Sequence, residues 1–404
     1  MPRSIGSFSA VGTAMFAAVV ILASACTPID PGPTTTTSST TSTTTSSTTT
    51  TTIVGGPPSI SSFAASRTTG PSPLTAAFTW SISDPDPGPL SCGLDLDDNG
   101  TFETNIFNCT SSSLRSATFT TPGANPVRLR VSDGTTAVTS TPLVINVGAA
   151  ASDQYAITVR SDGTLSTAQQ QAFSAAAARW SQVVRTGLPD VVINAPANLC
   201  GTGAPAFAGT VDDVVIDASI VAIDGPGGTL GMAGPCLIRA GGGLPAFGVV
   251  QFDTADVAAL QASGQLQAVI LHEIGHVLGI GTLWGGLLSG AGTPSPSFTG
   301  LAARGSWNAI VGGSTPSVPV ENTGGPGTAD GHWRESVFGN ELMTGFLNAG
   351  SNPLSAVTIG SLADLGYGVN LGAADPFGIA ALRAPDTPSV HVHSDLLRPI
   401  GTVG

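Results

Sequence analysis

The spacing of apolar residues divides the chain into parts with different periods. From residue 57 to 148, short stretches alternate apolar and polar residues between turn-forming residues, which is typical of half-buried β-strands. These stretches are Leu74–Trp80, Cys92–Leu96, Ala117–Thr120, Val127–Val131 and Leu143–Val147. Their size and spacing predict an all-β sandwich of about seven strands.

Residues 153–370 combine the helical and strand periods and predict an α+β domain. A capping-box pattern at Ser166–Gln169 opens a helix whose apolar residues, from Phe173 to Val184, share one face. We expect further helices at Thr254–Ala262, Gln265–Leu278 and Ser355–Leu365, and strands at Tyr155–Val159, Val191–Asn194, Val214–Ile216, Ile220–Ile223 and Phe247–Phe252. Residues 371–404 are interrupted by prolines, and we expect a loosely attached tail there.

The first 56 residues have the pattern of an export signal and a linker. Arg3 precedes a short apolar run, Val11–Ala23, and the small residues after it end at Cys26, as in a bacterial lipoprotein signal. We expect a signal peptide at residues 1–25, acylation of Cys26 and anchoring of the exported protein at the cell surface. Ordinary cleavage and free secretion is the alternative. The Ser/Thr-rich linker, residues 26–56, cannot bury a core.

Charge and cysteine content agree with an exported protein. The chain has 13 basic residues, all arginine, and 26 acidic residues, so its net charge of −13 disfavours binding to nucleic acid or to anionic membranes. Apart from Cys26, four cysteines remain, an even number that suggests disulfides in an oxidising compartment. We expect the pairs Cys92–Cys109 and Cys200–Cys236, although the sequence leaves the other connectivities open.

The candidate chemistry lies in one stretch, His272-Glu273-Ile274-Gly275-His276, which reads HExxH. Residues i and i+4 lie on one face of a helix, so His272 and His276 can hold one metal ion. Glu273 is placed to take a proton from a water that the metal activates and to pass it to a leaving amine. The motif therefore predicts one catalytic zinc ion, with Glu273 as the general base. Gly279 is suited to end the helix.

Two histidines leave the zinc short of a ligand. A Gly three residues after the second His suits metzincins, but Thr282 stands where their usual spacing places the third His. The segment 331–343, GHWRESVFGNELM, instead resembles the third-ligand and Met-turn region of leishmanolysin-like metallopeptidases, in which an insertion precedes the third His. This resemblance implies His332 as third ligand, Met343 as the turn methionine and residues 280–331 as the insertion. A Glu ligand is the rival, with Glu321, Glu335 and Glu341 as candidates.

The same resemblance covers roughly residues 155–370 and implies a metzincin-type fold, in which Phe247–Phe252 would be the edge strand that binds an extended substrate. Residues 57–150 resemble polycystic-kidney-disease-type (PKD) domains, which are immunoglobulin-like sandwiches, through motifs such as Asp84-Pro85-Asp86. Asp95, Asp97 and Asn99 copy the first half of a calcium loop, but its twelfth position is Ile106. A turn at Asn99-Gly100 is favoured over calcium binding.

The sequence thus predicts a multidomain protein: an immunoglobulin-like sandwich at 57–150, a zinc peptidase domain at 151–370 and a tail at 371–404. The predicted function is a surface-anchored zinc endopeptidase that acts on proteins or peptides. The alternative is a surface adhesion or binding lipoprotein with a structural metal. A structural zinc normally has four protein ligands, and no fourth is evident in the sequence. The sequence does not indicate an oligomeric state or a cleavage preference.

Overall fold

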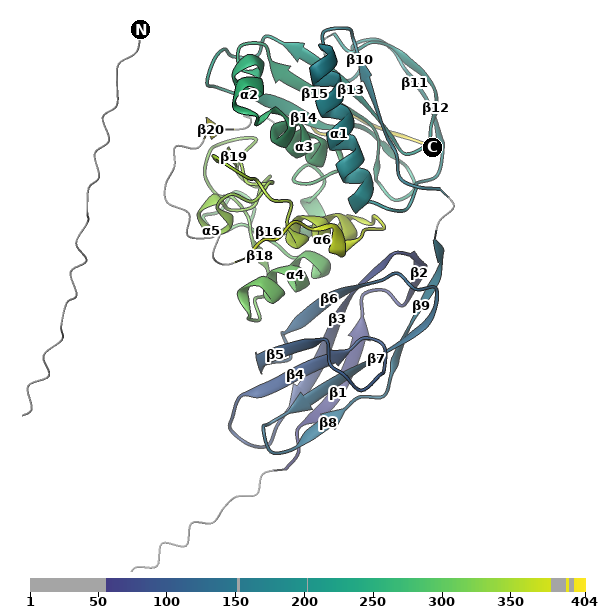
Figure 1. Ribbon diagram of the computed structural model, residues 1–404, viewed down its shortest axis with the longest axis vertical. Coiled ribbons are helices and arrows are strands. Elements are labelled where there is room, and N and C mark those ends of the chain that lie inside the picture. Colours follow the sequence, from purple (N-terminus) through teal and green to yellow (C-terminus); the bar gives the residue numbers. More distant parts are fainter. Residues whose placement is uncertain (1–55, 151–152, 202, 379–389, 392–395) are drawn as a thin grey trace, which may run out of the picture. The chain divides into compact units, whose positions relative to one another are not determined.

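The computed structural model describes residues 56–150, 153–201, 203–378, 390–391 and 396–404 (Figure 1). Residues 54–404 fall in one compact unit. The predicted signal peptide, Cys26 and all of the predicted linker except Gly56 lie outside the described residues. Within the described part of the chain, no helix is long and apolar enough to cross a membrane.

The first module, residues 59–150, consists of two β-sheets. One sheet has the order β1-β3-β6, and the other has the order β2-β9-β7-β4-β5, with β8 paired to β7. The strands are β1 (Ser59–Ala65), β2 (Thr69–Ser72), β3 (Leu74–Ser83), β4 (Leu90–Asp95), β5 (Thr104–Cys109), β6 (Leu114–Phe119), β7 (Gly123–Ser132), β8 (Ala137–Thr139) and β9 (Leu143–Ala150). The stretches predicted from alternation correspond to β3, β4, β6, β7 and β9.

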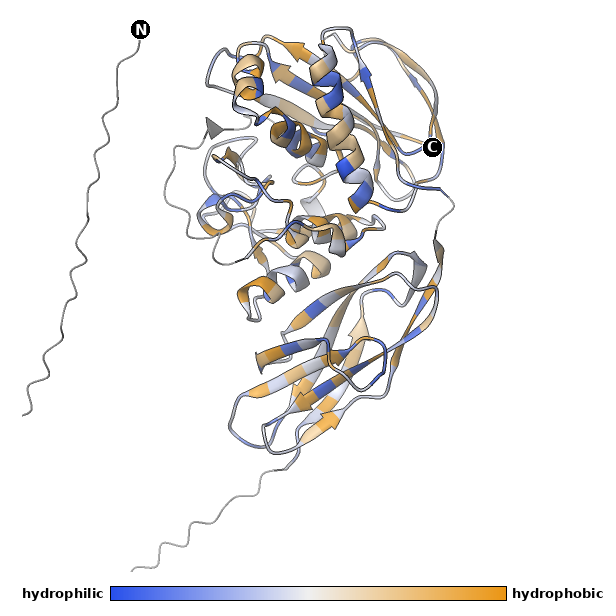
Figure 2. Ribbon diagram, viewed as in Figure 1, coloured by the Kyte–Doolittle hydropathy of each residue, from blue (hydrophilic) through white to orange (hydrophobic). Residues whose placement is uncertain are grey.

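Both sheets contribute side chains to a single core, because alternate residues of their strands point inward. Phe78 and Trp80 of β3 lie in this core with Leu129 and Val131 of β7. Figure 2 shows the same alternation as successive hydrophobic and hydrophilic segments along the strands. The predicted disulfide Cys92–Cys109 is confirmed and joins β4 to β5.

The second module is built on a five-stranded sheet with the order β10-β13-β15-β14-β21. Its strands are β10 (Ile157–Ser161), β13 (Val214–Val221), β15 (Pro245–Asp253), β14 (Gly231–Arg239) and β21 (Gly401–Val403). Strand β14 runs antiparallel to β15, and the other neighbouring pairs are parallel. The prediction of Phe247–Phe252 as an edge strand is wrong, since β15 pairs on both sides. Beyond β15 lies β14, and the short strand β21 pairs with Leu237–Arg239 of β14.

The tail prediction is also corrected in part, because β21 pairs with β14 and residues 396–403 are attached to the sheet. A separate two-stranded sheet is formed by β11 (Val191–Ala195) and β12 (Phe207–Val211). The second predicted disulfide, Cys200–Cys236, is confirmed. It links the segment that follows β11 with strand β14. The strand-rich, multi-sheet architecture expected from the sequence is therefore confirmed.

Two helices form the centre of the second module, α1 (Thr167–Val183) and α3 (Leu266–Val277). The predicted capping box is present at the start of α1, since Ser166 accepts a hydrogen bond from the Gln169 amide and the Gln169 side chain accepts one from the Ser166 amide. Trp180 of α1 donates its indole N–H to the carbonyl of Leu271 in α3 at 2.9 Å. This bond holds α1 against α3.

The second module contains further short elements. They are α2 (Val257–Ser263), η1 (Gly285–Leu287), β16 (Leu288–Ser289), β17 (Ser297–Phe298), α4 (Leu301–Val311), β18 (Val318–Pro319), α5 (Glu335–Phe338), β19 (Phe346–Leu347), α6 (Ala356–Leu365), η2 (Leu371–Ala373) and β20 (Val390–His391). The predicted insertion 280–331 is a packed structure, because its Trp284 and Phe298 rings contact each other and the ring of Trp333, which follows the insertion. Helix α6 begins after Ser355 and ends at Gly366, as predicted.

Candidate metal centre

Helix α3 presents His272 and His276 on one face, and the third histidine arrives on a separate segment. Gly279, with a φ of 110°, turns the chain away after the helix, and the Ile280 amide donates to the Gly275 carbonyl at 3.1 Å. The chain returns at His332, whose carbonyl accepts the Glu321 amide at 2.9 Å. All three imidazoles are buried, with exposed fractions of 0–2%.

The Nε2 atoms of the three histidines converge on one point. His272 Nε2 lies 2.9 Å from His276 Nε2, which lies 3.1 Å from His332 Nε2, and the third separation is 3.3 Å. Three nitrogens that each lie about 2 Å from a tetrahedral zinc ion are roughly 3.3 Å apart. The triangle of nitrogens therefore has about the size that a zinc ion requires.

The opposite ring nitrogen of each histidine contacts a backbone carbonyl. The Nδ1–carbonyl pairs are His272 with Leu342 at 2.6 Å, His276 with Ile280 at 2.8 Å and His332 with Thr328 at 2.9 Å. A carbonyl only accepts, so each Nδ1 carries the proton and each Nε2 of a neutral ring presents a lone pair. Lone pairs that face one another repel, and a cation between them removes this repulsion. The donor set therefore fits a metal ion.

Glu273 follows His272 on α3, and its carboxylate is fully buried. A Cβ atom at Gly231 of β14 would lie 3.1 Å from Glu273 Oε1, so the carboxylate lies against the backbone of this strand. Burial raises the pKa of Glu273 to about 8, although the neighbouring His272 acts in the opposite sense. A cation held by the histidines would stabilise the carboxylate and lower this pKa.

Met343 packs beneath α3, between the two histidines of the helix. A Cβ atom at Gly275 would lie 2.8 Å from Met343 Sδ and 3.2 Å from Trp180 Cζ2, so glycine allows both side chains to approach the helix backbone. Met343 has no solvent exposure. Met343 therefore contacts the helix that carries two of the histidines, and its role as a turn methionine stays a prediction.

Glu341 was a candidate ligand in the sequence, but its carboxylate is used elsewhere. Its Oε2 accepts the Met343 amide at 2.5 Å, and its Oε1 accepts the Ser355 amide and the Ser355 and Thr358 hydroxyls. Burial raises the pKa of Glu341, although these four hydrogen bonds act in the opposite sense. Glu341 thereby joins the turn that carries Leu342 and Met343 to the start of α6, a role that the sequence pattern did not reveal.

The other candidate ligands also have structural partners. Glu321 accepts hydrogen bonds from the amides of Asn322, Thr323 and Glu335. Thr282, at the usual metzincin position of the third histidine, donates its hydroxyl to the His276 carbonyl at 2.7 Å and so caps α3. Among the described residues, the group at this site that could hold a metal ion consists of His272, His276 and His332.

The predicted calcium residues lie in the turn between β4 and β5. Asp95, Asp97 and Glu103 bring carboxylate oxygens within 4.8 Å of one another, while the Asn99 amide donates to Asp97. Burial raises the pKa of Asp95, whereas hydrogen bonds from backbone N–H groups, including that of Gly100 at 2.8 Å, lower it. The hydrogen bonds outweigh burial, so the pKa of Asp95 lies below its usual value. These bonds account for the turn by themselves, and calcium binding stays a prediction.

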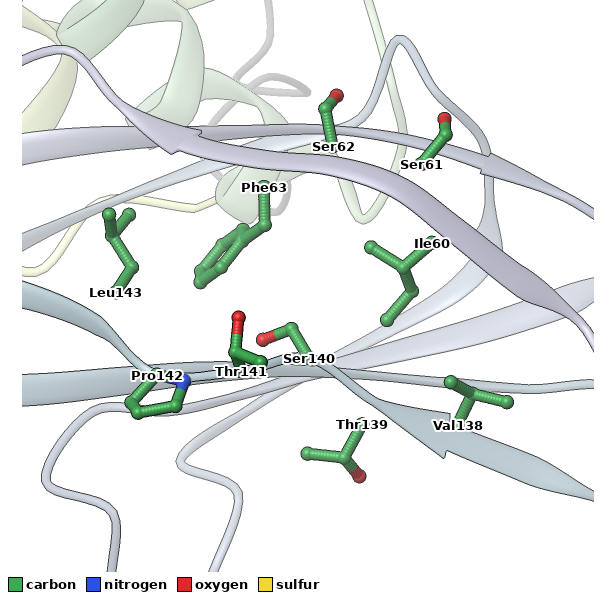
Figure 3. A pocket seen from close by; sticks show the side chains of 10 residues that line it. All are labelled: Ile60, Ser61, Ser62, Phe63, Val138, Thr139, Ser140, Thr141, Pro142 and Leu143. Atoms are coloured by element: carbon green, nitrogen blue, oxygen red, sulfur yellow. The ribbon is translucent and has the colours of Figure 1, made fainter.

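A surface pocket of about 370 Å³ lies in the first module (Figure 3). Its walls come from residues 60–63 of β1 and from residues 138–143, which include the end of β8. Figure 3 shows Phe63 and Ile60 facing the hydroxyls of Ser140 and Thr141 across this pocket. None of the histidines and none of the other predicted site residues line it, so it is separate from the metal centre.

Comparisons with known proteins cover family models, curated proteins and solved structures. The family model of leishmanolysin matches residues 314–381, a segment that contains His332 and Met343 but not α3. No curated protein matches the chain. Among solved structures, the PKD domain of an M14-like peptidase from Thermoplasmatales archaeon SCGC AB-540-F20 is 21% identical, with a TM-score of 0.20; the alignment covers 23% of this chain and 98% of that domain. Residues 314–381 are thus similar to a metallopeptidase family.

Proposed function

We propose that the protein is a zinc-dependent endopeptidase of the leishmanolysin-like, metzincin type. The observation that carries the proposal is the convergence of three Nε2 atoms beside the buried carboxylate of Glu273. The leishmanolysin match at residues 314–381 supports it, because that segment supplies His332 and Met343. The substrates would accordingly be proteins or peptides.

His272, His276 and His332 would hold one zinc ion, and their Nδ1 bonds to backbone carbonyls would keep the rings in place. A zinc ion bound there supplies Lewis acidity toward a water and toward a substrate carbonyl. Glu273 would take the proton that the attacking water loses and return it to the leaving amine. The burial of Glu273 favours this role, since a desolvated carboxylate is a stronger base than one in water.

The test compares wild type with Glu273→Gln and His272→Ala, measuring zinc per chain beside the hydrolysis rate of a fluorescently labelled unfolded protein. Glu273→Gln should keep its zinc, because Glu273 is not a ligand, and lose about 10²–10⁴-fold in rate, because an amide cannot accept the proton. His272→Ala should lose zinc and activity together. Activity of Glu273→Gln within a few-fold of wild type would refute the mechanism.

A surface-binding protein with a structural metal is the second candidate. Structural zinc sites normally have four protein ligands, whereas the described residues contribute three histidines here. Under this alternative Glu273→Gln would change neither zinc content nor any activity, and chelation would lower stability alone. The same assay therefore separates the two functions.

We further propose export and anchoring through an acylated Cys26, with residues 26–56 as a spacer. The support is the apolar run before Ala23-Ser24-Ala25-Cys26. Mass spectrometry of the mature N-terminus tests this proposal, and Cys26→Ser should release the protein or leave it unprocessed. An unacylated N-terminus at another residue would refute the anchoring.

A further inference from the structure

The outer edge of β14 is covered by the chain's own segment 396–403. The Leu397 amide donates to the Ala233 carbonyl at 3.2 Å, and the Ile400 amide donates to the Cys236 carbonyl at 2.9 Å. Further along, β21 pairs in parallel with Leu237–Arg239, and the Ala240 amide donates to the Val403 carbonyl at 2.8 Å. The segment thus saturates backbone groups of β14 that would otherwise form an open sheet edge.

The pairing begins beside the metal centre. Leu397 pairs with Ala233, two residues after Gly231, the residue that faces the carboxylate of Glu273. The approach at this end is close, since a Cβ atom at Gly234 would lie 2.2 Å from the Leu397 carbonyl oxygen. An extended peptide that added to β14 next to Glu273 would therefore meet the backbone of Leu397.

The same segment also contacts the loops on the histidine side of the centre. The Arg398 guanidinium donates to the carbonyls of Gly281 and Thr282, a few residues after His276. Leu396 packs against Gly331, which precedes His332, because a Cβ atom there would lie 2.3 Å from Leu396 Cδ1. Residues 396–398 therefore connect β14 to the loops that follow the second histidine and precede the third.

We propose that segment 396–404 is an intramolecular inhibitor that occupies the peptide-binding edge of β14 and must leave before a substrate binds. The inference rests on the proposed peptidase function. A peptide adds to a sheet edge through main-chain bonds, and one edge cannot hold two chains. The segment is suited to release, because parallel pairing is slightly weaker per residue than antiparallel pairing, and Pro399 has no amide to contribute.

The burial of the centre agrees with this role. Glu273 and the three histidines are 0–2% exposed, although a peptide bond must reach them for hydrolysis. While the segment is docked, substrate can bind only to the fraction of molecules in which it has left the edge. Removing the segment therefore raises the apparent substrate affinity by the inverse of that fraction and leaves the chemical step unchanged. The expected signature is therefore a fall in KM at constant kcat.

The experiment uses the full chain, a variant that lacks residues 396–404, Arg398→Ala and, as a control within the segment, Thr402→Ala. If the segment is docked in about nine molecules of ten, truncation should lower KM roughly tenfold. Arg398→Ala removes the bonds to Gly281 and Thr282, so the segment should leave the edge of β14 more often and KM should fall about fivefold. Thr402→Ala keeps the backbone pairing and should match wild type. An unchanged KM in Arg398→Ala and in a folded truncated chain would overturn the proposal.

A binding measurement keeps this inference separate from the peptidase assignment. The probe is a fluorescein-labelled peptide with the sequence LLRPIGTVG, residues 396–404. By fluorescence anisotropy it should bind the truncated chain at least about tenfold more tightly than the full chain, whose edge is already occupied. This outcome supports the docked segment even if no protein is hydrolysed. Equal binding, or none, to both chains would overturn the proposal even if the protein is an active peptidase.

Discussion

His272 Nδ1 lies 2.6 Å from the carbonyl oxygen of Leu342. Leu342 lies between Glu341 and Met343 in the chain. Glu341 accepts the Met343 amide with one oxygen and the start of α6 with the other. The orientation of a candidate metal ligand therefore depends on a buried carboxylate that does not face the metal. Mutation of groups that orient a metal ligand in this way typically costs about 10–100-fold in metal affinity.

Glu341→Ala should weaken zinc binding by about 10–100-fold, because the Leu342 carbonyl is no longer held against His272. Glu341→Gln should lose less, since its amide oxygen can still accept from Ser355 and Thr358 while its NH₂ group cannot accept from Met343. The measurement is a zinc titration against a competing chelator. The unfolding free energy of the metal-free variants is the control, because a purely structural role would lower it and leave the zinc affinity of the folded protein unchanged.

His332→Ala should lose most of the bound zinc, while Glu321→Ala should retain it. The reason is that His332 Nε2 lies within 3.3 Å of both other Nε2 atoms, whereas Glu321 accepts backbone amides. Zinc per chain after gel filtration measures the difference. Retention of zinc by His332→Ala together with its loss from Glu321→Ala would assign the third ligand to the glutamate.

Local signals in the sequence predicted α1, α2, α3 and α6 but missed α4 and α5. Ser166 and Gln169 form both bonds of the predicted capping box, and Ser355 and Gly366 bound α6 as expected. These signals are local, because a cap and its helix lie within a few residues. The spacing of His272 and His276 is local in the same way, so two of the three histidines followed from one turn of helix.

Non-local features could not be read from the sequence. Strand β14 was missed because it is buried on both faces and contains Pro235, so it lacks alternation. Its partner β21 is more than 150 residues away in the chain, and a pattern of residue types does not specify such pairing. For the same reason β15 was wrongly predicted to be an edge strand. The carbonyls that orient the histidines leave no trace in the sequence, because every residue has one.

Asp213 should make stability depend on pH between about 4 and 6. Burial raises the pKa of its carboxyl to about 6, although the amides of Ala156 and Leu188 act in the opposite sense. The native state thus binds the proton more tightly than the unfolded chain, so the contribution of Asp213 is fully present below pH 4. This contribution to the free energy of unfolding is lost as the pH rises to about 6, and the loss is roughly 3 kcal/mol at most.

The measurement for Asp213 is urea unfolding of wild type and Asp213→Asn at several pH values. The asparagine does not titrate, so the difference in unfolding free energy between wild type and variant should fall from pH 4 to 6 and stay constant above about pH 7. Loss of one amide bond in the variant adds an offset that does not depend on pH. A difference that is flat from pH 4 to 7 would show that Asp213 has an ordinary pKa.

Gly360→Ala should destabilise the protein, although alanine is the better helix former by about 1 kcal/mol. Gly360 lies in α6 where α4 crosses it, and a Cβ atom there would lie 2.7 Å from the Ala303 amide nitrogen and 2.8 Å from the Ala302 carbonyl carbon. Backbone atoms cannot rotate away as a side chain can, so the two helices must separate, at a cost of about 1–3 kcal/mol. Gly285→Ala is the matched control, since nothing lies within 4 Å of a Cβ atom at that position. Chemical unfolding of both variants decides the matter: a Gly360→Ala protein as stable as wild type would mean that α4 and α6 do not pack as closely as described.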